Sequence, residues 1–215
     1  MSGRRIATWF CGVVAIGALV AAAGLSTGPH GIDETPMPLP TVEFTDAPVA
    51  APADPVSEPE AGWPANRLII PSLGVDAPVE TIKSRGREVL IPHDPAIVGL
   101  FDEAATCTAT EGTTLVTGHV SSYGTHGALY SISTMRPGDE AILTCPDGSI
   151  TRWQVTGMRS WPKYTKTTKN DETIYDTQGQ RRLVLLTCGG RVITSGSHSG
   201  HYADLVAVYL EPTTT

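Results

Sequence analysis

The chain has 215 residues, of which 40 % are hydrophobic, so it can bury the core of one ordinary domain but not of two large ones. This apolar content excludes disorder throughout, and a formal net charge of −7 excludes the basic footprint that nucleic-acid binding requires. Its 17 prolines and 22 glycines indicate that part of the chain lies outside a packed core.

The N-terminus carries Arg4 and Arg5 and then runs uncharged and mostly apolar from Ile6 to Leu25, long enough as a helix to cross a bilayer. Two arginines before the run favour a cytoplasmic N-terminus and an exported remainder. We expect residues 1–25 to be a signal anchor that makes the protein a single-pass protein of the plasma membrane. A cleaved signal peptide is the alternative, with Ala21 to Ala23 near its cleavage point.

The next segment, residues 26–62, contains eight prolines, seven acidic residues and no Lys or Arg. This composition buries too little surface to fold, and its prolines keep it extended. It predicts an extracellular linker that accounts for most of the net negative charge of the chain. The following domain, residues 63–215, is then nearly neutral.

Short β-type runs with turn signals between them recur from Trp63 onward. The runs cover residues 67–70, 77–82, 88–91, 113–118, 139–145, 149–158, 182–187 and 205–210. Helical periodicity is confined to residues 97–105 and 127–135. About eight strands with short helices predict an all-β fold, either a closed barrel or a sandwich.

The cysteines fall into different settings. Cys11 lies in the apolar run, where it acts as a small apolar residue. In an oxidising compartment Cys107 and Cys145 are a possible disulfide, with two free buried thiols as the alternative. This pairing leaves Cys188 over.

Two strand ends carry reactive groups. The run from Thr113 ends in Gly118 and His119, and the run from Arg182 ends in Cys188 followed by two glycines that let a substrate approach. A thiolate attacks a carbonyl readily, and a nearby imidazolium can protonate the leaving amine. The two strand ends therefore indicate a nucleophile with an acid/base partner.

These segments resemble the sortases, the membrane-anchored cysteine transpeptidases of Gram-positive bacteria. The resemblance covers most of residues 63–210, and it includes Thr-Gly-His-Val at 117–120, Gly-Ala-Leu-Tyr at 127–130, Arg-Pro-Gly-Asp at 136–139 and Leu-Leu-Thr-Cys at 185–188. Class F is the most similar subclass, with class E next. The resemblance implies a closed eight-stranded β-barrel that cleaves a Leu-Pro-x-Thr-Gly-like sorting signal after Thr and passes the acyl group to an amine of a cell-wall precursor such as lipid II.

On this resemblance Cys188 is the nucleophile and His119 the general acid and base. Thr187, Gly189 and Gly190 would contact substrate, no cofactor is needed, and the partners are secreted proteins with a C-terminal sorting signal. The family also uses an arginine on the strand after the cysteine, but this sequence has no Lys or Arg after Arg191. We assign that role to Arg191.

Other assignments of the arginine's role remain open: Arg159 or His201 in its place, or weak or absent activity. His198 and His201 lack the second ligand pair of a zinc site, and the acidic residues are too scattered for a calcium loop, so we expect no metal. Two other functions remain: a hydrolytic cysteine peptidase, and a degenerate barrel that acts as a binding or scaffold module.

Overall fold

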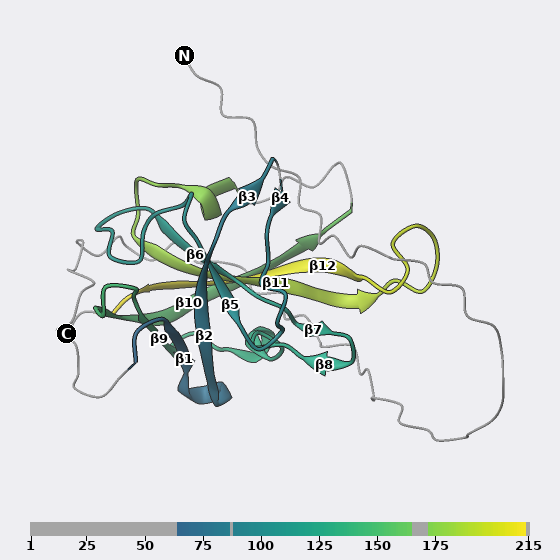
Figure 1. Ribbon diagram of the computed structural model, residues 1–215, viewed down its shortest axis with the longest axis horizontal. Helices are drawn as coiled ribbons and strands as arrows, with labels where there is room; N and C mark the ends of the chain where they lie inside the picture. The colour runs from purple at the N-terminus through teal and green to yellow at the C-terminus, as the bar shows by residue number, and fades with distance from the viewer. Residues whose placement is uncertain (1–63, 87, 165–171, 214–215) are drawn as a thin grey trace, which may run out of the picture.

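The computed structural model describes residues 64–86, 88–164 and 172–213 (Figure 1). The predicted anchor at 1–25 and linker at 26–62 lie outside the described residues. Within the described ranges, no helix combines the length and hydropathy needed to span a bilayer.

The predicted closed, eight-stranded β-barrel is confirmed. The strands close in the order β1-β2-β5-β6-β11-β12-β10-β9. Their bounds are β1 Arg67–Ile70, β2 Val75–Ile82, β5 Val98–Phe101, β6 Thr113–Thr117, β9 Glu140–Thr144, β10 Ile150–Pro162, β11 Arg182–Val192 and β12 Tyr202–Pro212. The pairs β2–β5 and β6–β11 are parallel, and the other neighbouring pairs are antiparallel.

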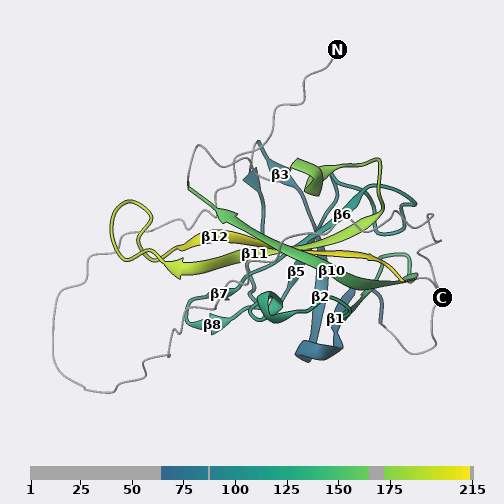
Figure 2. The same cartoon turned by 180° about the vertical axis from the view of Figure 1, so that it is seen from behind.

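Short hairpins and 3-10 helices lie in the connections between the barrel strands. Two hairpins pair β3 Ser84–Arg85 with β4 Glu88–Val89 and β7 Ser121–Ser122 with β8 Thr125–His126. Three short 3-10 helices are η1 Pro71–Leu73, η2 Ile132–Thr134 and η3 Glu172–Tyr175. The β7–β8 hairpin and the tip of the β11–β12 hairpin lie at the same end of the molecule in both views (Figures 1 and 2).

Two hydrophobic clusters cover the two faces of β11. Leu183 and Leu185 point into the barrel, whereas Val184 and Leu186 pack in a second cluster outside it. Alternate side chains of a strand point to opposite faces, so a strand that is covered on both faces needs a nearly continuous apolar run. The run from Leu183 to Leu186 has this composition and makes β11 the central strand of the domain.

The structure corrects two predicted elements. Residues 97–105, which we expected to hold a short helix, contain the barrel strand β5, because all four β5 residues are buried between the two clusters. Residues 88–91 do not form a barrel strand, since β4 pairs only with β3. In the predicted helical stretch 127–135 only η2 is helical, and it is a 3-10 helix.

The beginning of β11 is tied to the disulfide Cys107–Cys145, whose Cα atoms are 5.9 Å apart. Arg181, just before β11, is buried, and its guanidinium donates to the carbonyl oxygen of Cys107 at 2.8 Å and to Thr114 Oγ1 at 2.8 Å. It also lies 4.8 Å from the ring centre of Trp153 in the core. Burial lowers the pKa of Arg181 to about 10.

Candidate active site

The parallel pairing of β6 with β11 brings the two reactive strand ends together. Thr117 is paired with Leu186, so the next residues along each strand, Gly118 and Thr187, are also neighbours. Thr187 Oγ1 donates to the Gly118 carbonyl at 2.8 Å, and the Gly118 N–H donates to the Leu186 carbonyl at 3.2 Å. The ladder ends at the Thr117–Leu186 pair, and His119 and Cys188 each follow that pair by two residues, so both reactive residues lie at the same end of neighbouring strands.

Cys188 lies on the outer face of the barrel. It packs against the outer cluster with Leu186 and Trp161, while Thr187 points the other way. The Cys188 side chain is half-buried, and Cys188 is the cysteine of the described residues that is not in a disulfide. Its thiol is therefore accessible to a peptide that lies across the outer face of β6, β11 and β12.

A backbone carbonyl orients the ring of His119. Nε2 lies 2.9 Å from the carbonyl oxygen of Pro92, which can only accept, so Nε2 carries a proton. The bond uses one ring nitrogen and sets the orientation of the imidazole.

The backbone of His119 is held from behind by the segment that begins at Gly127. The Leu129 N–H donates to the His119 carbonyl at 3.2 Å, and the Gly127 N–H donates to the Val120 carbonyl at 2.9 Å. A Cβ on Gly127 would collide with the His119 backbone. The Gly-Ala-Leu-Tyr segment singled out in the sequence therefore positions the histidine.

A lysine that the sequence analysis did not select contacts the nucleophile. Lys163, directly after β10, donates from Nζ to Cys188 Sγ at 3.4 Å. Its own N–H donates to the Ala203 carbonyl at 2.8 Å, which continues the β10–β12 ladder by one more residue. Nothing local in the sequence marks Lys163, because its contact depends on the register of β10 against β12.

The two glycines after Cys188 have different surroundings from each other. Gly189 is paired with Asp204, and Gly190 takes a left-handed conformation at φ 75° in an irregularity of the β11–β12 ladder. A Cβ on Gly190 would collide with the Asp204 carboxylate. Burial raises the pKa of Asp204, and the positive charge of the exposed Arg191 opposes part of that rise. Arg191 is thus placed near a carboxylate of β12.

The alternatives to Arg191 lie nearby. Arg159 is exposed on β10, opposite Ala207, which in turn is opposite Leu186 and not Cys188. His201 stands at the start of β12 with its ring edge toward Tyr164, at 6.5 Å between ring centres. Tyr164 also packs on His198 at 3.9 Å. These rings connect the end of β10 to the β11–β12 loop.

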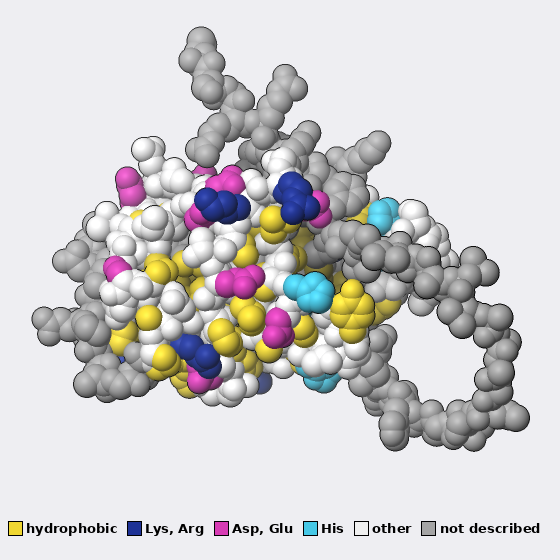
Figure 3. Space-filling view, in the orientation of Figure 1, with side chains coloured by type: hydrophobic (Ala, Val, Ile, Leu, Met, Phe, Trp, Pro, Cys, Tyr) yellow, Lys and Arg dark blue, Asp and Glu magenta, His cyan; other side chains and the backbone are white. Residues whose placement is uncertain are grey.

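The part of the chain that the structure describes contains no candidate metal centre. No group of three or more His, Cys, Asp or Glu side chains converges within it. On the face shown in Figure 3, basic side chains lie beside acidic ones. The described residues include the ion pairs Arg67–Asp76 at 2.7 Å and Lys83–Asp102 at 3.2 Å.

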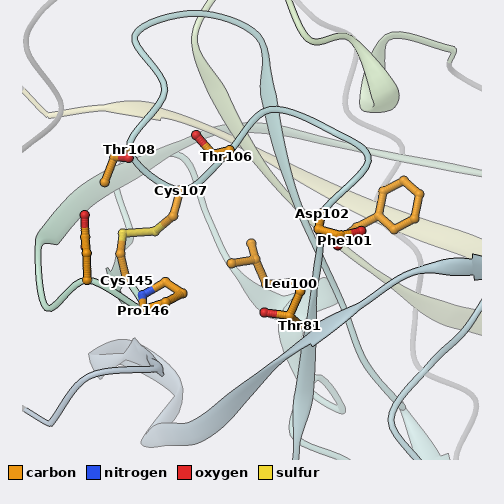
Figure 4. Close-up of a pocket in the computed structure, with 10 residues that line it drawn as sticks. Thr81, Leu100, Phe101, Asp102, Thr106, Cys107, Thr108, Cys145 and Pro146 are labelled. Carbon is orange, nitrogen blue, oxygen red and sulfur yellow. A yellow bond between two sulfur atoms is a disulfide. The ribbon is translucent and has the colours of Figure 1, made fainter.

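A cavity of about 270 Å³ lies at the disulfide. Leu100 and Phe101 line one side of it, and Cys107, Cys145 and Pro146 line the other (Figure 4). Its lining includes neither His119 nor Cys188. The cavity is therefore distinct from the pair of reactive groups.

Comparison with known proteins identifies the fold family. The family model described as the sortase domain matches residues 68–203. The chain belongs to the sortase family. This membership implies a cysteine transpeptidase-type function that acts on proteins with sorting signals and on amine acceptors. No curated protein sequence matches the chain significantly.

Solved structures of sortases share the barrel. Sortase C from Streptococcus pneumoniae is 18 % identical, with 70 % of this chain and 69 % of that chain covered, at a TM-score of 0.53. The complex of Streptococcus agalactiae sortase C1 with MTSET is 17 % identical, with 69 % and 67 % covered, at a TM-score of 0.52. At these identities the likeness establishes the fold alone.

Proposed function

We propose that this sortase is a class F-like, membrane-anchored transpeptidase, held by residues 6–25 with its barrel outside the cell. It cleaves a Leu-Pro-x-Thr-Gly-like sorting signal after Thr and transfers the acyl group to an amine of a cell-wall precursor. The observation that carries the proposal is the parallel pairing of β6 with β11, which ends two residues before His119 on one strand and two residues before Cys188 on the other.

In the first half-reaction the Cys188 thiolate attacks the carbonyl carbon of the signal's Thr. The tetrahedral intermediate collapses when the C–N bond to Gly breaks, and His119 donates a proton to the departing amine. The products are a thioester on Sγ, a free glycine amine and a neutral imidazole. Because Pro92 holds Nε2–H, the proton that moves is the one on Nδ1.

In the second half-reaction an incoming amine attacks the thioester carbonyl. The neutral imidazole of His119 accepts a proton from that amine, the C–S bond breaks, and the thiolate and imidazolium are restored. If water takes the place of the amine, the same residues give hydrolysis. The balance between the two outcomes depends on which nucleophile reaches the thioester.

The test uses the 215-residue chain with a panel of Leu-Pro-x-Thr-Gly-type peptides, with and without triglycine, and mass spectrometry of the products. We expect an amide product that needs triglycine and that disappears in Cys188→Ala and His119→Ala. Hydrolysis product alone would replace the proposal by the peptidase. Intact peptides throughout, from folded protein with a free Cys188 thiol, would favour the binding module.

A further inference from the structure

The cation in hydrogen-bond contact with the nucleophile is Lys163, the residue directly after β10. Lys163 Nζ is 3.4 Å from Cys188 Sγ, and the residue is half-buried, so part of its charge is shielded from water. An ammonium so close to a thiol stabilises the thiolate over the neutral form. Lys163 therefore acts on the atom that carries out the attack.

The register of the strands explains how the side chain of Lys163, directly after β10, reaches Cys188 on β11. Trp161, Leu205 and Cys188 form one row across β10, β12 and β11. Lys163 lies two residues beyond Trp161 and so projects from the same outer face. On β12 the alternation places Ala203 on that face, and its small side chain leaves room for the lysine stem to cross to Sγ.

Other charged or titratable groups of the described residues lie at this end of the barrel. His119, just after β6, binds the Pro92 carbonyl, and the positive charge of Arg191, in the irregular part of β11, acts on the carboxylate of Asp204 on β12. Arg159 on β10 lies in the row of Leu186. Lys163 is the group for which the structure gives a contact with the sulfur itself.

We propose that Lys163 is the catalytic cation that holds Cys188 as a thiolate, a role separate from the one we assign to Arg191. Its ammonium transfers no proton: it keeps its three hydrogens while the sulfur becomes a thioester and again when the thiolate returns. The consequence for transpeptidation rests on the function proposed above. The consequence for the thiol does not, because thiolate formation needs no peptide.

The test measures alkylation of Cys188 by iodoacetamide in the 215-residue chain as a function of pH, following the peptide that contains Cys188 by mass spectrometry. This readout separates Cys188 from Cys11. Lys163→Met and Lys163→Gln remove the charge, and Lys163→Arg keeps it. Lys83→Met removes a lysine of the Lys83–Asp102 ion pair and serves as the control.

We expect both neutral variants to raise the alkylation midpoint by about one to three pH units, as loss of a close opposite charge does. The alkylation rate at pH 6.5 then falls about tenfold or more. Lys163→Arg should keep the midpoint within about half a unit, and Lys83→Met should leave it unchanged. Should Lys163→Met fail to fold, Lys163→Gln, which keeps a polar end, decides the matter.

An unchanged midpoint in a folded neutral variant would overturn the proposal. So would a midpoint that moves in Arg191→Met and not in Lys163→Met. A chain that transfers no peptide but shows the expected shift would contradict the proposed function and leave the role of Lys163 intact. A chain that transfers peptide but shows no shift would support the proposed function and contradict the role of Lys163.

Discussion

The two ends of β11 bring sulfur and a positive charge together in opposite ways. At the start, Arg181 is buried and donates to the loop that carries the Cys107–Cys145 disulfide. Near the other end, the half-buried Lys163 donates to the free thiol of Cys188. The difference lies in burial and oxidation state: at the first end the arginine is buried and the cysteines are joined in a disulfide, and at the second the half-exposed sulfur of Cys188 is in no disulfide and can react.

The largest effects should come from replacing the cysteines at each end by alanine. Cys188→Ala should remove acyl transfer completely, more than about a thousandfold, and change the free energy of unfolding by less than about 1 kcal/mol, because the thiol is half-buried. Cys107→Ala with Cys145→Ala should do the opposite and lower stability by about 3–4 kcal/mol, as expected for a 38-residue separation.

Urea denaturation and peptide turnover below the melting temperature measure both properties in the same samples. If the double cysteine variant, while folded, lost activity as fully as Cys188→Ala, the two ends would not be independent and the comparison would fail.

Gly127→Ala tests how the reactive end is positioned. The added Cβ collides with the His119 backbone, so the imidazole should move away from Cys188 and turnover should fall about a hundredfold. Alkylation of Cys188 at high pH should continue, because the thiol stays in place. Turnover within twofold of wild type would show that the histidine tolerates this displacement.

Arg181→Met tests the structural end. Its loss leaves the carbonyl of Cys107 and the hydroxyl of Thr114 without their donor, and we expect stability to fall by about 2–3 kcal/mol. Turnover at 25 °C should stay within about twofold, because Arg181 lies seven residues before Cys188, just outside the opposite end of β11. Urea denaturation measures the stability, and peptide kinetics measure the turnover. A large loss of turnover in folded protein would show that the structural end also controls the reaction and would contradict the comparison.

The smallest expected effect concerns pH. Burial raises the pKa of Asp204, so the native state keeps this proton to higher pH than the unfolded chain does. Stability is then greatest below the unfolded value and declines as the pH rises through the folded one, by less than about 1 kcal/mol for a partly exposed group. Asp204→Asn should flatten that part of the profile, measured by urea denaturation between pH 3.5 and 7. An identical profile in the variant would assign the decline to other groups.

The barrel and the pair of His119 and Cys188 could be predicted from the sequence because both leave local signals in it. Short β-type runs marked seven of the barrel strands, and a histidine and a cysteine each stood at the end of such a run. Val98–Phe101 was missed since a short run buried on both faces has no period that separates strand from helix. Residues 88–91 have strand composition, but a hairpin partner took them out of the barrel.

Lys163 could not be predicted because its contact is set by three strands at once. The register of β10 on β12 and of β12 on β11 fixes which residue faces Cys188, and a shift of one residue would turn the lysine to the other face. The role of Arg191 stays a prediction, now with Asp204 as its neighbour.

The most direct test of the account is to find where the acyl group sits during turnover. The 215-residue chain is incubated with an intact Leu-Pro-x-Thr-Gly-type peptide that it cleaves, without an added amine, then quenched in acid and digested, and the modified peptide is sequenced by mass spectrometry. The account predicts a thioester on Cys188 that forms in wild type, is strongly reduced in His119→Ala, and disappears when triglycine is added. An acyl group on any other residue, or cleavage that persists in Cys188→Ala, would contradict it.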